Sequence, residues 1–159
     1  YERKFRLIDD ELFSYYKYGT SKTEKWYKIK FSLDHGYKVF SFKIKGKSKH
    51  FKFHRVVYYS HNPEWNIYDS SKYNFIDHVD RIKTNNDISN LRNVTNQENQ
   101  FNRDAKGYYF NKAKGKYQAQ IQLNGKMIPI GCYNTPELAR EAYLRKKAEL
   151  HIIPQRIHN

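Results

Sequence analysis

The stretch FIDHVD at residues 75–80 opens the part of the sequence that decides the expected fold. Its first five residues favour a short β-strand, and a loop dense in Asn and Asp follows over residues 80–90. Residues 91–95 favour a second short strand, and the polar residues at its end can cap a helix over residues 97–103. The order strand, long loop, strand and helix predicts a ββα unit at the centre of the chain.

Upstream of this unit, residues 1–53 are expected to form a small, basic, antiparallel β-meander. Alternating residues separated by turn sequences predict strands over residues 26–31, 37–45 and 49–53. The first 25 residues have no clear period, and either a short helix over residues 9–18 or an irregular arm is expected there. A further short helix is predicted over residues 54–59, and Asn62-Pro63 ends it.

A second folded unit is expected downstream, over residues 106–153. Residues 116–123 alternate cleanly, and Asn124-Gly125 is a strong hairpin turn that returns the chain as a partner strand over residues 126–132. A helix is expected over residues 135–150, because Thr is a good N-cap and the Pro and Glu that follow it suit the first helical turn. The chain as a whole is therefore predicted to belong to the α+β class.

The composition indicates a folded protein. Hydrophobic residues make up only 38% of the chain and the mean hydropathy is −1.00, but aromatic residues reach 17%, and disordered chains lack aromatics. No apolar run approaches the roughly 20 residues that cross a bilayer, so no membrane partner is expected. The single cysteine, Cys132, excludes disulfide frameworks and thiolate zinc sites and fits a reducing, intracellular compartment.

The net charge of +14 favours a polyanionic partner, and nucleic acid is the commonest polyanion inside cells. The charge is uneven, since residues 1–60 carry +9 and residues 106–159 carry +7, whereas residues 61–105 carry −2. Two basic flanks around an acidic centre suit phosphate-binding arms on either side of a cation site. The alternative is a lysine-rich surface that only keeps the protein in solution.

Asp77 and His78, with the Asn residues behind them, suit the hydrolysis of a phosphodiester bond. That reaction needs a base for water, a divalent cation for the charge that develops on phosphate, and hard oxygen ligands for the cation. Magnesium needs only one or two protein ligands. Asp77 and Asn99 have suitable oxygens, with Asn96 and Asn102 as alternatives to Asn99. Taken alone, an Asp-His pair is more often an ordinary turn or surface pair, and Asn-rich segments are often ordinary loops.

An ordered series of short motifs makes this interpretation more specific. The motifs are Ile76-Asp-His-Val-Asp80, Lys83-Thr-Asn-Asn-Asp87, Asn90-Leu-Arg92, Val94-Thr95, Glu98-Asn99 and Asn102-Arg103, with His54-Arg-Val-Val57 and Asn62-Pro63 upstream. Together they resemble the HNH nuclease motif, in the branch found in phage intron-encoded homing endonucleases, over about residues 37–103. The resemblance implies a ββα-metal fold, with a nuclease core over residues 54–104.

The HNH resemblance also implies roles for individual residues. Asp77 would bind the metal and His78 would be the general base. Asn90 would pin the loop so that His78 is held in place, and Asn99 would be the second metal ligand. That position is often His in the wider family, and an amide in place of an imidazole suits Mg²⁺ or Mn²⁺ rather than zinc. His54 is expected to be structural, with a phosphate contact as the alternative.

Arginines near this centre are candidate DNA contacts. They are Arg55, Arg92 and Arg103. For Arg92 and Arg103 the alternative is an ion pair, with Asp87 and Glu98 as the partners.

The downstream unit resembles a second family. Its motifs are Gly107-Tyr-Tyr109, Gly115-Lys-Tyr-Gln-Ala-Gln-Ile121, Ile130-Gly131, Thr135-Pro-Glu-Leu-Ala139 and Ala142-Tyr143. Together they resemble an Apetala-type DNA-binding domain over about residues 106–153. The resemblance implies a three-stranded antiparallel sheet packed on one helix, with the sheet in the major groove of DNA. Where plant members carry Arg and Trp for base contacts, this chain mostly has Tyr, Gln, Met and Pro, so the target sequence does not carry over.

Alternation along the hairpin predicts one polar face. The residues expected to face the helix are Tyr117, Ala119, Ile121 and Leu123, and those on the other face are Lys116, Gln118, Gln120 and Gln122. Gln can pair with adenine, and Lys can reach guanine or phosphate. Tyr109 and Lys126 complete the predicted DNA contacts. The alternative is an ordinary polar face exposed to solvent.

These observations predict a DNA endonuclease with one divalent cation, Mg²⁺ or Mn²⁺, a histidine general base and no other cofactor. One active site per chain predicts nicking of double-stranded DNA by a monomer or weak dimer, with a homing role first and a restriction role second. The rival hypotheses are a DNA-binding regulator with a degenerate HNH unit and an RNA-binding protein that stacks bases on its tyrosines. Residues 154–159 are expected to be a tail.

Overall fold

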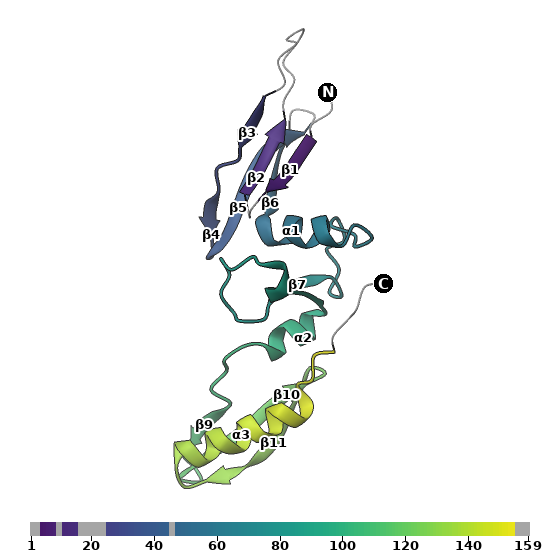
Figure 1. Ribbon diagram of the computed structural model, residues 1–159. Helices are drawn as coiled ribbons and strands as arrows, with labels where there is room; N and C mark the ends of the chain where they lie inside the picture. Colours follow the sequence, from purple (N-terminus) through teal and green to yellow (C-terminus); the bar gives the residue numbers. More distant parts are fainter. Residues whose placement is uncertain (1–3, 9–10, 16–24, 45–46, 155–159) are drawn as a thin grey trace. The chain divides into compact units, whose positions relative to one another are not determined.

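The computed structural model describes residues 4–8, 11–15, 25–44 and 47–154, and Figure 1 shows their secondary structure. Within these ranges the chain consists of small antiparallel sheets and three α-helices, so the predicted α+β class is confirmed. The chain divides into two compact units, the first ending at Asn93 and the second beginning at Val94. None of the described helices is long and apolar enough to cross a membrane.

The first unit begins with two three-stranded antiparallel sheets. β1 (Lys4–Ile8), β2 (Glu11–Tyr15) and β3 (Trp26–Lys28) form one sheet in the order β1-β2-β3. β4 (Ser32–Asp34), β5 (Tyr37–Ile44) and β6 (Lys47–Lys52) form the other in the order β4-β5-β6. An antiparallel meander is therefore present upstream of the centre.

The start of the chain differs from both expectations. The helix over residues 9–18 is wrong within the described residues, because β2 occupies their middle, and the irregular arm is wrong because β1 pairs with β2. Leu12 of β2 is almost fully buried, and this burial is a tertiary effect that local periodicity does not reveal. The strand expected over residues 26–31 is confirmed only over β3, which ends at Lys28, and β4 begins after it at Ser32. Between the two strands the Ile29 N–H donates to the carbonyl of Leu12 at 2.8 Å.

The helix α1 (Phe53–His61) packs against β5, β6 and β7. It has no side-chain N-cap, so its stability comes mainly from the face that it buries. At its other end, the backbone N–H and the amide of Asn62 both donate to the carbonyl of Tyr58, and Pro63 follows. The core of the first unit contains Leu12, Phe40, Phe53, Val57, Tyr58, Trp65, Ile76 and Leu91.

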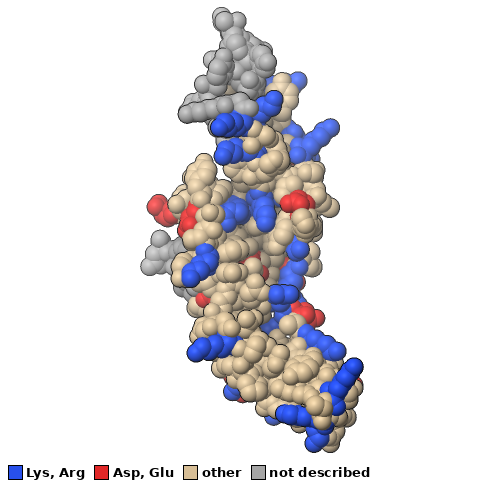
Figure 2. Space-filling model, turned by 180° about the vertical axis from the view of Figure 1, so that it is seen from behind, with Lys and Arg blue, Asp and Glu red and all other residues tan. Residues whose placement is uncertain are grey.

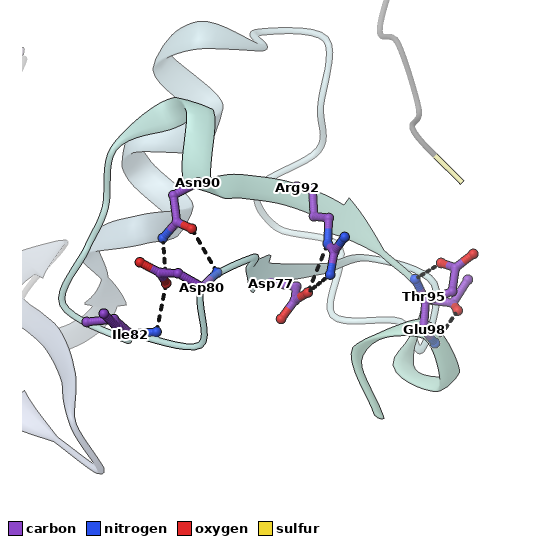
Figure 3. A network of polar contacts seen from close by, with 7 residues as sticks. All are labelled: Asp77, Asp80, Ile82, Asn90, Arg92, Thr95 and Glu98. Atoms are coloured by element: carbon purple, nitrogen blue, oxygen red, sulfur yellow. Dashed lines mark hydrogen bonds and ion pairs between the residues drawn. The ribbon is translucent and has the colours of Figure 1, made fainter. Parts of the chain in front are cut away.

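The centre has the predicted order of elements. β7 (Phe75–His78) pairs with β8 (Leu91–Val94), and the short 3₁₀ helix η1 (Ile88–Asn90) precedes β8. α2 (Asn96–Phe101) follows and begins with a capping box. The Thr95 hydroxyl accepts from the Glu98 N–H, and the Glu98 carboxylate accepts from the Thr95 N–H, as Figure 3 shows.

The second unit contains a three-stranded antiparallel sheet and a long helix. β9 (Tyr108–Asn111), β10 (Lys116–Leu123) and β11 (Lys126–Tyr133) lie in the order β11-β10-β9. α3 (Pro136–Leu150) packs against this sheet and buries Ala139, Ala142 and Tyr143. Gly107, before β9, has a φ of +78°, and a Cβ there would lie 2.0 Å from Tyr143 Cγ. Only glycine suits both the backbone and the space at this position.

The stability of the first unit is expected to depend on Phe53, which is 0% exposed. Phe53→Ala should lower the free energy of unfolding by about 3–5 kcal/mol, because it removes a ring and leaves a cavity. Trp26 and Trp65 are the two tryptophans and both lie in this unit, so their fluorescence during denaturation measures its unfolding. Tyr68→Ala is the control, because Tyr68 is 83% exposed, and a change there above about 1 kcal/mol would contradict the assignment of the core.

Candidate active site

Asp77 and His78 are the last two residues of β7, and both side chains are buried, with 7% and 4% of their surface exposed. Neighbouring residues on a strand point to opposite faces. The carboxylate and the imidazole therefore have different partners, although they lie side by side in the sequence.

The partner of Asp77 is Arg92, which lies on the neighbouring strand β8. Its Nε and Nη2 donate to Asp77 Oδ2 at 3.0 and 2.8 Å, as Figure 3 shows. The Arg92 side chain is 30% exposed, so one end of a buried carboxylate is paired with a charge that solvent can still reach. The sequence left Arg92 open between a phosphate contact and an ion pair, and an ion pair is present, with Asp77 and not with Asp87 as the partner. Instead, Asp87 begins η1, where its carboxylate accepts from the Ser89 N–H.

Asn90 fastens the loop that follows β7. Its Oδ1 accepts from the Asp80 N–H at 3.0 Å, and its Nδ2 donates to Asp80 Oδ1 at 2.9 Å and to the carbonyl of Asn85 at 2.8 Å. Its backbone carbonyl accepts from the Val79 N–H at 2.9 Å. Asn90 therefore holds the residues directly after His78.

Two consecutive residues of the loop, Asp80 and Arg81, have unusual properties. Desolvation raises the pKa of Asp80, but hydrogen bonds from Asn85, Ile82 and Asn90 outweigh it, and the pKa lies below its ordinary value. Arg81 has a φ of +67°, in the left-handed region that non-glycine residues seldom occupy. Its N–H donates to the carbonyl of His78 at 2.9 Å, which continues β7 into this turn.

Asn86 is the loop residue that bonds His78, and no sequence pattern distinguishes it from the other Asn residues of the loop. His78 Nε2 and Asn86 Oδ1 are 3.1 Å apart. The Asn86 amide Nδ2 donates to the carbonyl of Thr84 at 3.1 Å, which fixes the orientation of the amide because a carbonyl only accepts. Oδ1 must then accept from an Nε2–H, so the neutral imidazole carries its basic lone pair on Nδ1.

Two aromatic rings pack against His78. The ring of His54 lies 5.0 Å from it in an edge-to-face arrangement, and the ring of Tyr37 lies 5.9 Å from it. Tyr37 and His54 are in turn 5.1 Å apart, so the three rings form a closed cluster. Burial, and then the charge of Asp77, raises the pKa of Tyr37. Tyr37 belongs to the meander, and nothing in its local sequence marks it as a neighbour of His78.

His54 is buried beside His78 and Tyr37. Burial, and then His78, Lys52 and Arg55, lowers its pKa to about 3. Its Nδ1 is buried and finds no hydrogen-bond partner among the described residues.

Arg55 supports a different part of the first unit. Its guanidinium donates to the carbonyls of Ile67, Asp69 and Asn74 and lies 4.6 Å from the ring of Trp65. These contacts hold the segment between α1 and β7, and they leave Arg55 poorly suited to the DNA contact considered from the sequence.

The remaining central candidates belong to the second unit. Asn99 lies on α2, where its N–H donates to the carbonyl of Thr95 at 2.9 Å. Arg103 follows the helix, and its Nη1 donates to Gln100 Oε1 at 2.9 Å.

The donor chemistry of these residues fits a hard cation. Among the described residues no three His, Cys, Asp or Glu side chains cluster closely enough to hold a metal ion. Magnesium does not need such a cluster, because water and phosphate complete the coordination of an ion held by one or two protein oxygens. The carboxylate of Asp77 and the amide of Asn99 are oxygen donors of this kind.

The sheet of the second unit brings most of its predicted contacts to one face. The strand register places Gln118 opposite Tyr109, Gln120 opposite Pro129 and Gln122 opposite Met127. Gln118 Oε1 also accepts from Asn111, the register partner of Lys116. Lys126 differs, because it pairs with Leu123 and therefore shares the face on which α3 packs.

Basic side chains are spread over the surface that Figure 2 shows, whereas acidic side chains form a few isolated spots there. Some of these cations are already engaged. Arg140, for example, donates to the carbonyls of Ala105 and Lys106 and pairs with Asp104 at 2.8 Å.

The tautomer of His78 can be tested directly. We expect imidazole ¹⁵N chemical shifts at neutral pH to show a proton on Nε2 in the wild type, because Asn86 Oδ1 accepts from it. Asn86→Leu should populate the other tautomer, whereas Asn85→Leu should not, because the Asn85 amide bonds Asp80 instead. A wild-type protein protonated on Nδ1 would contradict the arrangement.

The pH dependence of stability follows from His54. Its pKa is near 6.5 in an unfolded chain and about 3 in the folded protein, so between these values the unfolded state binds more protons. The first unit should therefore lose stability as the pH falls from about 7 to about 5. His54→Leu, which cannot titrate, should lose less over the same range in denaturation followed by tryptophan fluorescence. Equal losses in the two proteins would count against a buried neutral His54.

The comparisons with known proteins agree with this location. No curated protein and no solved structure matches the chain. Residues 51–101, which include α1, β7, the loop and β8, match the family model described as HNH endonuclease. The match covers the segment that contains Asp77, His78 and Asn86, and it supports an HNH nuclease.

Proposed function

We propose that the chain is a DNA endonuclease that hydrolyses phosphodiester bonds with His78 as the general base and one divalent cation. The observation that carries the proposal is the buried Asp77–His78 pair, with its imidazole held by Asn86, inside the segment that matches HNH endonucleases. A regulator without activity would have no need to bury and orient these groups.

His78 acts through Nδ1. Asn86 occupies Nε2–H, so Nδ1 is the nitrogen that removes a proton from the attacking water. His54 and Tyr37 limit rotation of the ring, because both pack against it. Asn90 acts one step further away by holding the loop that contains Asn86.

Asp77 is the proposed ligand of the cation, Mg²⁺ or Mn²⁺, and Asn99 on α2 stays a candidate ligand only through the HNH resemblance. When bound, the ion stabilises the charge that develops on phosphate and on the leaving oxygen. Arg92 orients the Asp77 carboxylate through Oδ2 and offsets its charge. Its partial exposure also leaves it available to a phosphate oxygen of the substrate.

The two flanks of the chain position double-stranded DNA. The glutamine face of the second unit, with Tyr109 and Lys116, suits an Apetala-type contact with base edges, and Arg103 suits a phosphate contact. One base and one cation per chain cut one strand, so a monomer or weak dimer would act as a nicking enzyme. A homing role, inside a cell, is preferred to a restriction role.

The test is conversion of supercoiled plasmid to the nicked form in the presence of Mg²⁺. The wild type should nick, His78→Ala should be slower by about 10²–10⁴-fold through loss of the base, and EDTA should stop the reaction. His50→Ala is the matched control, because His50 is exposed on β6 and bonds Ser41.

Intact plasmid with both the wild type and His78→Ala would contradict the nuclease. If the wild type retained DNA without cutting it, a non-catalytic DNA-binding regulator would be the better assignment. Preferential retention of single-stranded RNA would favour the RNA-binding hypothesis.

A further inference from the structure

Tyr37 lies beside His78 and is flanked by two lysines. Lys52 Nζ is 4.7 Å from the centroid of the Tyr37 ring, and Lys83 Nζ is 4.8 Å from the same centroid. The three residues come from separate elements, since Tyr37 begins β5, Lys52 ends β6 and Lys83 lies in the loop after β7. The fold therefore brings two positive charges and a phenol together next to the candidate base.

The two ammonium groups have unused hydrogen-bonding capacity. Neither forms an ion pair with a carboxylate of the described residues. Lys83 Nζ donates to the carbonyl of His35 at 2.9 Å, and an ammonium has two further N–H groups. Both lysines are exposed. Two like charges held at one ring repel each other unless an anion lies with them.

Other lysines of the first unit provide a comparison. Lys25 lies 5.6 Å from the ring centroid of Tyr27, and Lys72 lies 5.1 Å from that of Tyr73. In each of these pairs a single lysine lies over an exposed ring. Only at Tyr37, among the described residues, do two lysines share one ring, so packing of alkyl chains on tyrosine does not explain the arrangement.

We propose that Lys52, Lys83 and the Tyr37 hydroxyl form a binding site for one or two backbone phosphates of DNA next to the bond that is cut. The inference rests on the proposed nuclease function and adds to it a substrate site that extends from the β4-β5-β6 sheet to the loop after β7. A lysine ammonium binds phosphate as a compact charge, and tyrosine hydroxyls are common phosphate donors. Because the rings of Tyr37 and His78 are 5.9 Å apart, the site would hold the DNA backbone close to the bond that His78 helps to hydrolyse.

The test compares a K52Q/K83Q variant with K25Q/K72Q, which loses the same charge from the two single-lysine rings. DNA affinity is measured against salt concentration in EDTA with all proteins carrying His78→Ala, so that no cleavage occurs. Each lost phosphate contact should reduce the slope of log affinity against log salt by about 0.9, so K52Q/K83Q should lose about 1–2 and K25Q/K72Q clearly less. K52R/K83R should keep the wild-type slope. Equal slopes for the two Gln variants would overturn the proposal.

A second measurement identifies the phosphates and is insensitive to a modest loss of stability. In a short duplex, single phosphates are replaced by neutral methylphosphonates. Replacement at one or two positions next to the bond that is cut should weaken DNA binding by the protein that carries His78→Ala alone. The same replacements should have no further effect on binding by K52Q/K83Q. If every position affects the two proteins alike, the site does not exist.

The inference and the proposed function fail separately. If the wild type does not nick DNA, the proposed nuclease function is contradicted, but the binding experiments in EDTA still decide whether the phosphate site exists. If the wild type nicks DNA and the salt slope of K52Q/K83Q is unchanged, only the phosphate site is contradicted.

Discussion

The ion pair between Arg92 and Asp77 is the interaction on which the candidate active site depends. A carboxylate that leaves water loses several kcal/mol of solvation, and only a partner of good geometry recovers it. Arg92 donates twice to one oxygen of Asp77, and it can do so only while β8 stays paired with β7. Because His78 follows Asp77 on the same strand, the ion pair also fixes where the imidazole lies.

The loop after β7 is held mainly by neutral amides. Asn85, Asn86 and Asn90 each donate through the side chain, and their partners are carbonyls and the carboxylate of Asp80. An amide both donates and accepts, so a few of them can fix a loop that has little apolar surface to bury. The arrangement places one acceptor, Asn86 Oδ1, against His78 without adding a second negative charge beside Asp77.

Much of the centre could be predicted from the sequence because its key residues are adjacent or belong to short ordered motifs. Asp77 and His78 could be named as candidates without knowledge of the fold. The strands around them follow from the β propensity of their residues, and the helix follows from its capping box. The partners could not be predicted in this way. Arg92 was left open between a phosphate contact and an ion pair, and Asp77 was not among its candidate partners. Asn86 was not distinguished from its neighbours, and Tyr37 lies far upstream. Each of these contacts depends on strand pairing or on the path of the loop. The strands β1 and β2 were not predicted because they depend on tertiary contacts, such as the burial of Leu12, that local periodicity does not reveal.

The left-handed backbone of Arg81 destabilises the loop, and no side-chain contact of Arg81 offsets this within the described residues. Arg81 adopts a left-handed backbone for which glycine or asparagine would serve at about 1 kcal/mol less. Its side chain is exposed and forms no hydrogen bond or ion pair with the described residues. Replacement of Arg81 by glycine or asparagine would therefore stabilise the folded state, at a position close to the buried Asp77 and His78.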